Sequence, residues 1–229
     1  MLRVGLLIIA LSLTLPLFAQ QEKKPLDNTT REGMEWANFW WENAPDTTLP
    51  RVLLIGDSIT NQYRGEVQTL LKGKANVDMM ATSANILDPQ FTTAVKLAVG
   101  DYHYAVIHFN NGLHGFHLTA EQYEAGLRRM VDLLKQLNPQ AKLIWANNTP
   151  IVEASKVDTL AGGNATVLAR NEISARVMQE LGIPIDDLYT PSVGHPEYRN
   201  TGDGYHFNNA GKAVQAQAVV KIISSALGL

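Results

Sequence analysis

The stretch Arg51-Val-Leu-Leu-Ile-Gly-Asp-Ser-Ile-Thr60 joins a short apolar run to a polar turn. The run Val52–Ile55 has β-branched ends and no polar residue, which is typical of a strand buried on both faces of a parallel sheet. Gly56 ends the run, so Asp57 and Ser58 fall at the carboxyl end of the strand, the edge where open α/β sheets bind ligands. Ser58 is therefore a candidate nucleophile, although Gly-Asp-Ser alone is also the pattern of a turn followed by a helix cap.

A second polar motif lies near the end of the chain. Asp203-Gly-Tyr-His206 comes just before a final helix, which is predicted from about Asn208 to the C-terminus. A serine hydroxyl is a weak nucleophile and needs a base within hydrogen-bond reach. The base in turn needs a third group that fixes its tautomer and stabilises the imidazolium. Asp203 and His206 can supply that pair.

Three motifs together resemble those of the SGNH (GDSL-type) hydrolases. They are Gly56-Asp57-Ser58-Ile59-Thr60 near the start, Asn110 in the middle and Asp203-x-x-His206 near the end. Their order, wide separation and places at predicted strand ends match that family over essentially the whole chain after residue 50. The resemblance implies that Ser58 is the nucleophile, that His206 is the base, that Asp203 orients His206, and that no cofactor is needed.

The resemblance also implies an oxyanion hole built from three donors. They are the backbone N–H of Ser58, an N–H after the second strand and the side chain of Asn110. Ser83 aligns with the second position, where the family has glycine, and Ala84 is the alternative. This departure leaves the role possible, because a backbone donor does not require glycine.

The block His108-Phe-Asn-Asn111 lacks the glycine and the aspartate of the family pattern. Asn111 stands where the family has aspartate and is expected to shape the loop. Because strand side chains alternate, Asn110 and Asn111 should point in different directions. The residues that could line the substrate site are Asp57, Asn111, His114 and His117.

Strand-like and helix-like segments alternate along the chain after residue 50. This alternation predicts a single three-layer α/β/α domain with a five-stranded parallel sheet, and the resemblance implies the flavodoxin-like SGNH fold. Residues 151–163 are expected to be irregular, and a long loop of residues 188–205 returns Asp203 to the rim of the sheet. The predicted strands are 52–55, 75–81, 104–109, 142–146 and 183–185, and the predicted helices are 63–72, 89–99, 119–137, 165–181 and the last one from about 208.

The N-terminal residues form a separate region before the domain at 50–229. Residues 1–19 have a small positive start, a short apolar core and a cleavage site before Gln20, which predicts a signal peptide; an uncleaved membrane anchor is the alternative. Residues 20–49 are predicted to be a leader with a short helix at Glu35–Glu42, on which Trp36, Phe39 and Trp40 share one face. That face could pack against the core or stack on sugars.

Composition narrows the function further. The net charge is −3 and the sequence has no basic run, so nucleic acid is not expected as a partner. The absence of cysteine rules out a disulfide, a cysteine nucleophile and a thiolate metal site, and it is compatible with export. His114 and His117, with His108 nearby, lack a carboxylate ligand at helical spacing, and no metal site is expected.

These observations predict an exported serine esterase, periplasmic or secreted, without stable membrane insertion after signal cleavage. The substrate is expected to be a small-molecule or polysaccharide ester, and the resemblance to secreted bacterial members favours O-acetyl groups on carbohydrate. A lipase or thioesterase of the same family is the alternative within enzymes. A catalytically silent glycan-binding relative that uses Trp36, Trp40 and Trp41 is the alternative outside them. The sequence leaves the oligomeric state open.

Overall fold

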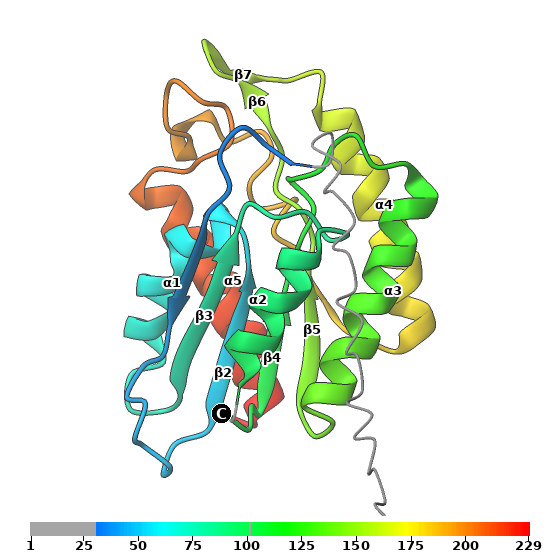
Figure 1. The fold of residues 1–229 in the computed structure, drawn as a ribbon. Helices are drawn as coiled ribbons and strands as arrows, with labels where there is room; N and C mark the ends of the chain where they lie inside the picture. The colour runs from blue at the N-terminus through cyan, green and yellow to red at the C-terminus, as the bar shows by residue number, and fades with distance from the viewer. Residues whose placement is uncertain (1–30, 101) are drawn as a thin grey trace, which may run out of the picture.

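The central sheet has the strand order β1-β3-β2-β4-β5-β8 in the computed structural model, which describes residues 31–100 and 102–229. Five of its strands are parallel, as predicted, and their carboxyl ends meet at the upper edge of Figure 1. A sixth strand, β1, pairs antiparallel with the outer side of β3. The bounds are β1 Ala37–Trp40, β2 Arg51–Gly56, β3 Asn76–Thr82, β4 Val106–Phe109, β5 Lys142–Ala146 and β8 Ile185–Asp186.

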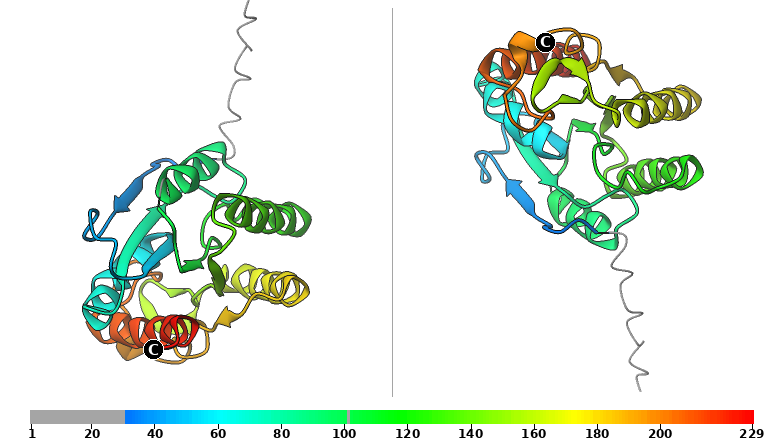
Figure 2. Two further views of the ribbon diagram at one scale, coloured as in Figure 1. Left: turned by 90° about the horizontal axis from the view of Figure 1, so that it is seen from below. Right: turned by 90° about the horizontal axis from the view of Figure 1, so that it is seen from above.

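Helices cover both faces of the sheet, which confirms the α/β/α prediction (Figure 2). β2 shows how the layers form, because all six of its residues are buried. Leu53 and Ile55 face the core under α2, α3 and α4, whereas Val52 and Leu54 face the core under α1 and α5. The bounds are α1 Ser58–Leu70, α2 Pro89–Val99, α3 Ala120–Leu137, α4 Asn164–Leu181 and α5 Asn209–Leu227.

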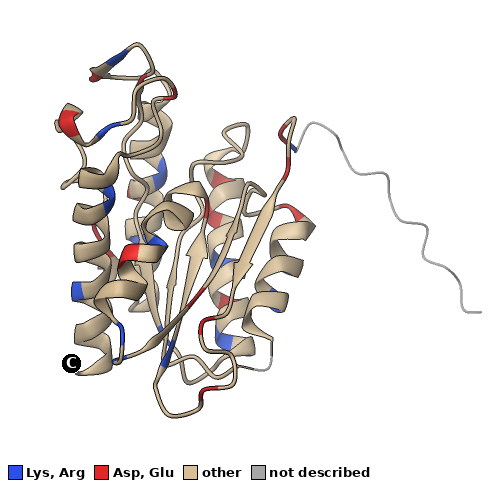
Figure 3. Cartoon of the chain, turned by 90° about the vertical axis from the view of Figure 1, so that its left-hand side faces the viewer, with Lys and Arg blue, Asp and Glu red and all other residues tan. Residues whose placement is uncertain are grey.

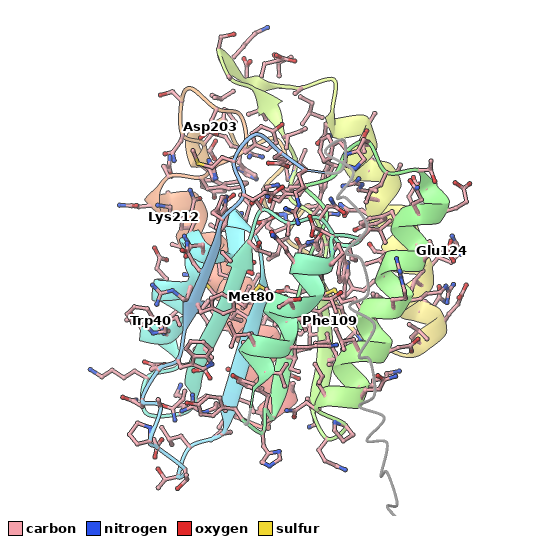
Figure 4. The ribbon with its side chains drawn as sticks, in the orientation of Figure 1. Trp40, Met80, Phe109, Glu124, Asp203 and Lys212 are labelled. Carbon is pink, nitrogen blue, oxygen red and sulfur yellow. The ribbon has the colours of Figure 1, made fainter. Side chains whose placement is uncertain are left out.

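The predicted helix at Glu35–Glu42 is wrong, because Ala37–Trp40 forms β1. Without β1, the outer edge of β3 would expose a row of unpaired backbone groups, and pairing with β1 satisfies them. Side chains therefore alternate: Phe39 packs against the core beneath α2 and stacks on Trp41 with 5.7 Å between ring centroids. Trp40 lies on the opposite face beneath the guanidinium of Arg64, at 4.4 Å, and remains 48% exposed (Figure 4). The sheet thus begins within the predicted leader.

Other segments differ from the prediction in smaller ways. α1 starts at Ser58 and not at Tyr63, because Asp57 caps it. The stretch 151–163, predicted to be irregular, contains a hairpin of β6 Val152–Glu153 and β7 Lys156–Leu160 above the rim (Figure 1). The loop before α5 contains a short 3-10 helix, η2 Pro196–Tyr198. Thr119, the first residue of the predicted helix 119–137, is the N-cap of α3 and forms a full capping box with Gln122.

The surface carries both signs of charge, and acidic and basic residues are interspersed over the helices and loops in Figure 3. The mixed charges do not test the prediction that nucleic acid is not a partner, which stays a prediction. Within residues 31–100 and 102–229, none of the helices combines the length and the apolar character needed to span a bilayer. The predicted signal peptide lies outside the described residues.

Candidate active site

Ser58 is the first residue of α1, directly beyond the carboxyl end of β2. Gly56 allows the chain to turn there, since a Cβ at this position would lie 2.0 Å from Oγ1 of Thr60. Asp57 is the N-cap, and its Oδ1 accepts a hydrogen bond of 2.9 Å from the N–H of Ile59. As the first helical residue, Ser58 has an N–H with no carbonyl one turn earlier to receive it. The turn therefore presents both a hydroxyl and a backbone donor at the rim.

The structure brings the three residues of the two predicted motifs together. Nε2 of His206 lies 2.9 Å from Oγ of Ser58, and Nδ1 of the same ring lies 2.7 Å from Oδ2 of Asp203. The other carboxylate oxygen of Asp203 accepts the backbone N–H groups of Tyr205 at 2.7 Å and of His206 at 2.9 Å. The loop that carries Asp203 lies above the strand ends in Figure 4. A continuous chain of hydrogen bonds thus joins carboxylate, imidazole and hydroxyl.

The electrostatics of Asp203 favour its charged form. Partial burial by itself raises its pKa, but the backbone and side-chain hydrogen bonds from His206 and the backbone N–H of Tyr205 outweigh that effect, and the pKa lies below its ordinary value. The side chains of His206 and Asp203 are 30% and 42% exposed. The carboxylate is therefore ionised near neutral pH and can balance a positive charge on the imidazole.

Asn110 and Asn111 point in opposite directions, as predicted. Nδ2 of Asn110 donates toward β5, to the carbonyl of Ala146 at 2.7 Å and to Oδ1 of Asn148 at 3.1 Å. Nδ2 of Asn111 donates toward the loop after β3, to the carbonyl of Ala84 at 2.9 Å. Both amide hydrogens of Asn110 are thus engaged, which differs from the expectation of a free donor beside Ser58.

The predicted donor at Ser83 is not free in the structure. Its N–H donates to the carbonyl of Trp36 at 3.2 Å, and its hydroxyl contacts the N–H of Trp36 and a carboxylate oxygen of Glu35. The alternative, the N–H of Ala84, donates to Oγ1 of Thr82 at 3.1 Å. The Ser83 donor is engaged because the pairing of β1 with β3 continues one residue past both strands, where the carbonyl of Trp36 accepts the N–H of Ser83. The engaged N–H of Ser83 thus differs from the expectation of a free donor, and its role in the oxyanion hole stays a prediction.

The four predicted lining residues have different environments. Asp57 and Asn111 are buried, and Oδ2 of Asp57 has no hydrogen-bond partner within the described residues. Nδ1 of His114 lies 2.7 Å from Oε1 of Glu32, and His117 is exposed. His108 does not join them, because its Nε2 contacts Oδ2 of Asp186 at 2.9 Å inside the core.

Three residues outside the predicted site support the rim. Asn148 accepts from Asn110 and is itself held by Asn171, whose Oδ1 accepts the backbone and side-chain N–H of Asn148 at 2.8 Å each. Arg170 donates to the carbonyls of Gly112, His114 and Gly115 and so fixes the loop after β4. The signal for Asn148 was its place after β5, the same strand-end position that identified Asn110.

Comparison with known families adds one decisive observation. Residues 54–214 match the model of the GDSL-like Lipase/Acylhydrolase family, and this range includes Ser58, Asn110, Asp203 and His206. The chain belongs to this family. It is accordingly a hydrolase of ester bonds. A comparison with curated protein sequences found no match.

Several solved structures share the fold. A carbohydrate esterase family 3 protein from Talaromyces cellulolyticus has a TM-score of 0.65 at 18% identity, with 79% of this chain and 100% of that chain covered. An acetyl xylan esterase has a TM-score of 0.64 at 17% identity, covering 76% and 99%. A GDSL-like lipase from Bacteroides thetaiotaomicron has a TM-score of 0.59 at 18% identity, covering 77% and 88%. At these identities the likeness concerns the fold.

Proposed function

We propose that this GDSL-like hydrolase is an exported serine esterase that removes short acyl groups, above all acetyl groups, from carbohydrate. The observation that supports the proposal best is the hydrogen-bond chain from Asp203 through His206 to Ser58. Oγ of Ser58 bonds to the ester carbonyl carbon while Nε2 of His206 takes the hydroxyl proton. The alcohol then leaves with that proton, and an acyl group remains on Ser58.

A water molecule completes the cycle. It gives a proton to His206 and attacks the acyl carbon; the carboxylic acid leaves, and Ser58 regains its proton from His206. Throughout, Asp203 holds the ring so that Nε2 faces Ser58 and balances the charge of the imidazolium.

The oxyanion in this proposal is stabilised by the N–H of Ser58 and by Asn110. The Ser58 donor lies at a helix N-terminus, where the helix dipole also favours negative charge. Asn110 contributes when its longer hydrogen bond, 3.1 Å to Asn148, is exchanged for one to the oxyanion. Ser83 stays a predicted third donor, whose N–H is donated to Trp36 in the structure.

The preference for a short acyl group rests on the resemblance to secreted carbohydrate esterases of the family. The cavity lined by residues that include Asp57, Asn110, Leu113 and Thr149 does not bear on it, because its volume of about 10 Å³ holds at most one water molecule. The acetyl xylan esterase and the family 3 carbohydrate esterase among the structures with this fold agree with a carbohydrate substrate.

Substitution of the nucleophile tests the mechanism. Ser58→Ala should keep the fold but lose hydrolysis by several orders of magnitude, and a fluorophosphonate probe should no longer label the protein. Ser225→Ala, an exposed serine on α5, is the matched control and should behave as the wild type. Esterase activity that survives Ser58→Ala would refute the mechanism. A wild-type protein that the probe does not label would favour a silent glycan-binding relative.

Substrate class and export need separate measurements. Acetylated glycans and a series of p-nitrophenyl esters should show acetate release and poor turnover of long chains; a preference for long chains would favour the lipase alternative. N-terminal sequencing of the protein from its native host should begin near Gln20. An intact Met1 on soluble cytoplasmic protein would exclude export.

A further inference from the structure

The loop that carries Asp203 and His206 is closed by backbone pairing at its base. Arg199 and Phe207 form an antiparallel bridge. Next to it, the N–H of Asn200 donates to the carbonyl of His206 at 3.0 Å, and the N–H of Asn208 donates to the carbonyl of Tyr198 at 2.9 Å. The position of the imidazole therefore depends on what holds this base against the rest of the fold.

The guanidinium of Arg199 supplies such a connection. It is 5% exposed, and its Nη2 donates to the carbonyl of Pro150, just after β5, at 2.9 Å. Its Nη1 donates to the carbonyl of Tyr205 at 3.3 Å, and its Cζ lies 3.9 Å from the ring centroid of Phe207. The two residues on either side of His206 are thus both contacted by one side chain, which also reaches the loop after β5.

Keeping a charge at this place is costly. Burial lowers the pKa of Arg199 to about 10, and the nearby negative charge of Asp203 opposes that effect. Among residues 31–100 and 102–229, no carboxylate oxygen lies within 4.0 Å of its nitrogen atoms. A hydrocarbon side chain would fill the same space without the desolvation cost, but it could not hold two carbonyls in a fixed geometry.

We propose that Arg199 is a positioning residue for ester hydrolysis, which holds the backbone around His206 so that Nε2 stays within reach of Ser58. This inference rests on the proposed function. Arg51 provides a matched control at the other end of the sheet. It is 6% exposed, donates to the carbonyls of Glu42 and Asn43 and lies over the ring of Tyr102, but it also pairs with Asp78 and has no link to His206.

Kinetics of Arg199→Ala, Arg199→Lys and Arg51→Lys test the role. Misplacement of a catalytic group by about 1 Å can cost about 10²-fold. We therefore expect Arg199→Ala to lower kcat by about that factor with little change in KM, and added guanidinium ion to restore part of it. Arg199→Lys should fall between Arg199→Ala and the wild type, because an ammonium can hold only part of the geometry. Arg51→Lys should lower Tm while kcat stays near the wild-type value.

The rate of labelling by a fluorophosphonate probe separates the two possible failures. If the probe labels the wild type, and labels Arg199→Lys more slowly than Arg51→Lys, the inference is supported. This comparison remains valid if Arg199→Ala does not fold. If the probe labels the wild type and labels the two lysine variants at equal rates, the role of Arg199 is overturned and the serine mechanism stays intact. Absence of labelling in the wild type would overturn the proposed function, and the role of Arg199 with it.

Discussion

Replacing Asp203 by asparagine changes one charge at nearly constant shape, and the structure shows what must follow. Oδ1 of Asp203 accepts two backbone N–H groups, while Oδ2 faces Nδ1 of His206. An asparagine that keeps its oxygen toward the two N–H groups turns its NH₂ toward Nδ1. The ring must then carry its proton on Nε2, where it donates to Ser58 and can no longer accept the hydroxyl proton.

The opposite orientation of the amide is also unfavourable. It restores an oxygen beside Nδ1 but places NH₂ against the N–H groups of Tyr205 and His206, which costs two hydrogen bonds of about 1 kcal/mol each. The wrong tautomer lowers kcat by about 10⁴ in serine proteases, where the carboxylate is buried. Asp203 has a side chain that is 42% exposed, and water screens part of the effect. We therefore expect kcat to fall about 10²–10³-fold, with KM and Tm little changed.

Steady-state hydrolysis of p-nitrophenyl acetate near neutral pH measures this loss, and thermal unfolding followed by circular dichroism checks the fold. Asp158→Asn is the control, because Asp158 is an exposed aspartate on β7 whose carboxylate contacts only Thr159 among the described side chains. A wild-type kcat in Asp203→Asn would refute the role of the Asp203 carboxylate in orienting His206.

Three further predictions use other parts of the site and fold. Asn110→Ala should lower kcat by about 10²–10³-fold, and it should also lower Tm because the amide of Asn110 makes two hydrogen bonds. Asn111→Ala should lower mainly Tm. If activity and unfolding measurements give the reverse result, the oxyanion donor is Asn111. The hydrolysis rate should fall below about pH 6, where an imidazole base takes up a proton, because the pKa of the Asp203 carboxylate lies too low for it to titrate there; a rate that stays flat to about pH 4 would argue against a histidine base. Hydrogen bonds from arginines on α3 and α4 lower the pKa of Glu124 from 4.5 to about 2, so its contribution to stability is present above its unfolded pKa and is lost as the pH falls through that window. The Tm advantage of the wild type over Glu124→Gln should therefore shrink between these values, while Glu172→Gln, an exposed position on α4, should show no such trend.

The sequence determined the parallel sheet and the chemistry at its rim. An apolar run such as Val52–Ile55, ended by Gly56 and with β-branched residues at its ends, is typical of a strand buried on both faces of a covered parallel sheet. Ser58 follows from the turn that ends this run, and Asp203 and His206 lie close in sequence, so their mutual geometry is local. The caps of α1 and α3 are local for the same reason, because the side chain and the backbone N–H that it accepts are at most three residues apart.

Only the tertiary structure decided the features that depend on a distant partner. Residues 37–40 are too few for their aromatic pattern to separate a helical period from a strand period, and the unpaired edge of β3 made them a strand. Trp36, the residue before that strand, accepts the N–H of Ser83, so the availability of this donor depends on a residue 47 positions earlier in the chain. Arg199 is an ordinary loop residue in the sequence and gains its place because Pro150 and Phe207 meet around it. Hydrogen bonds between residues far apart in the chain have no local signature, since either partner could as well be solvated by water until the fold brings the two together.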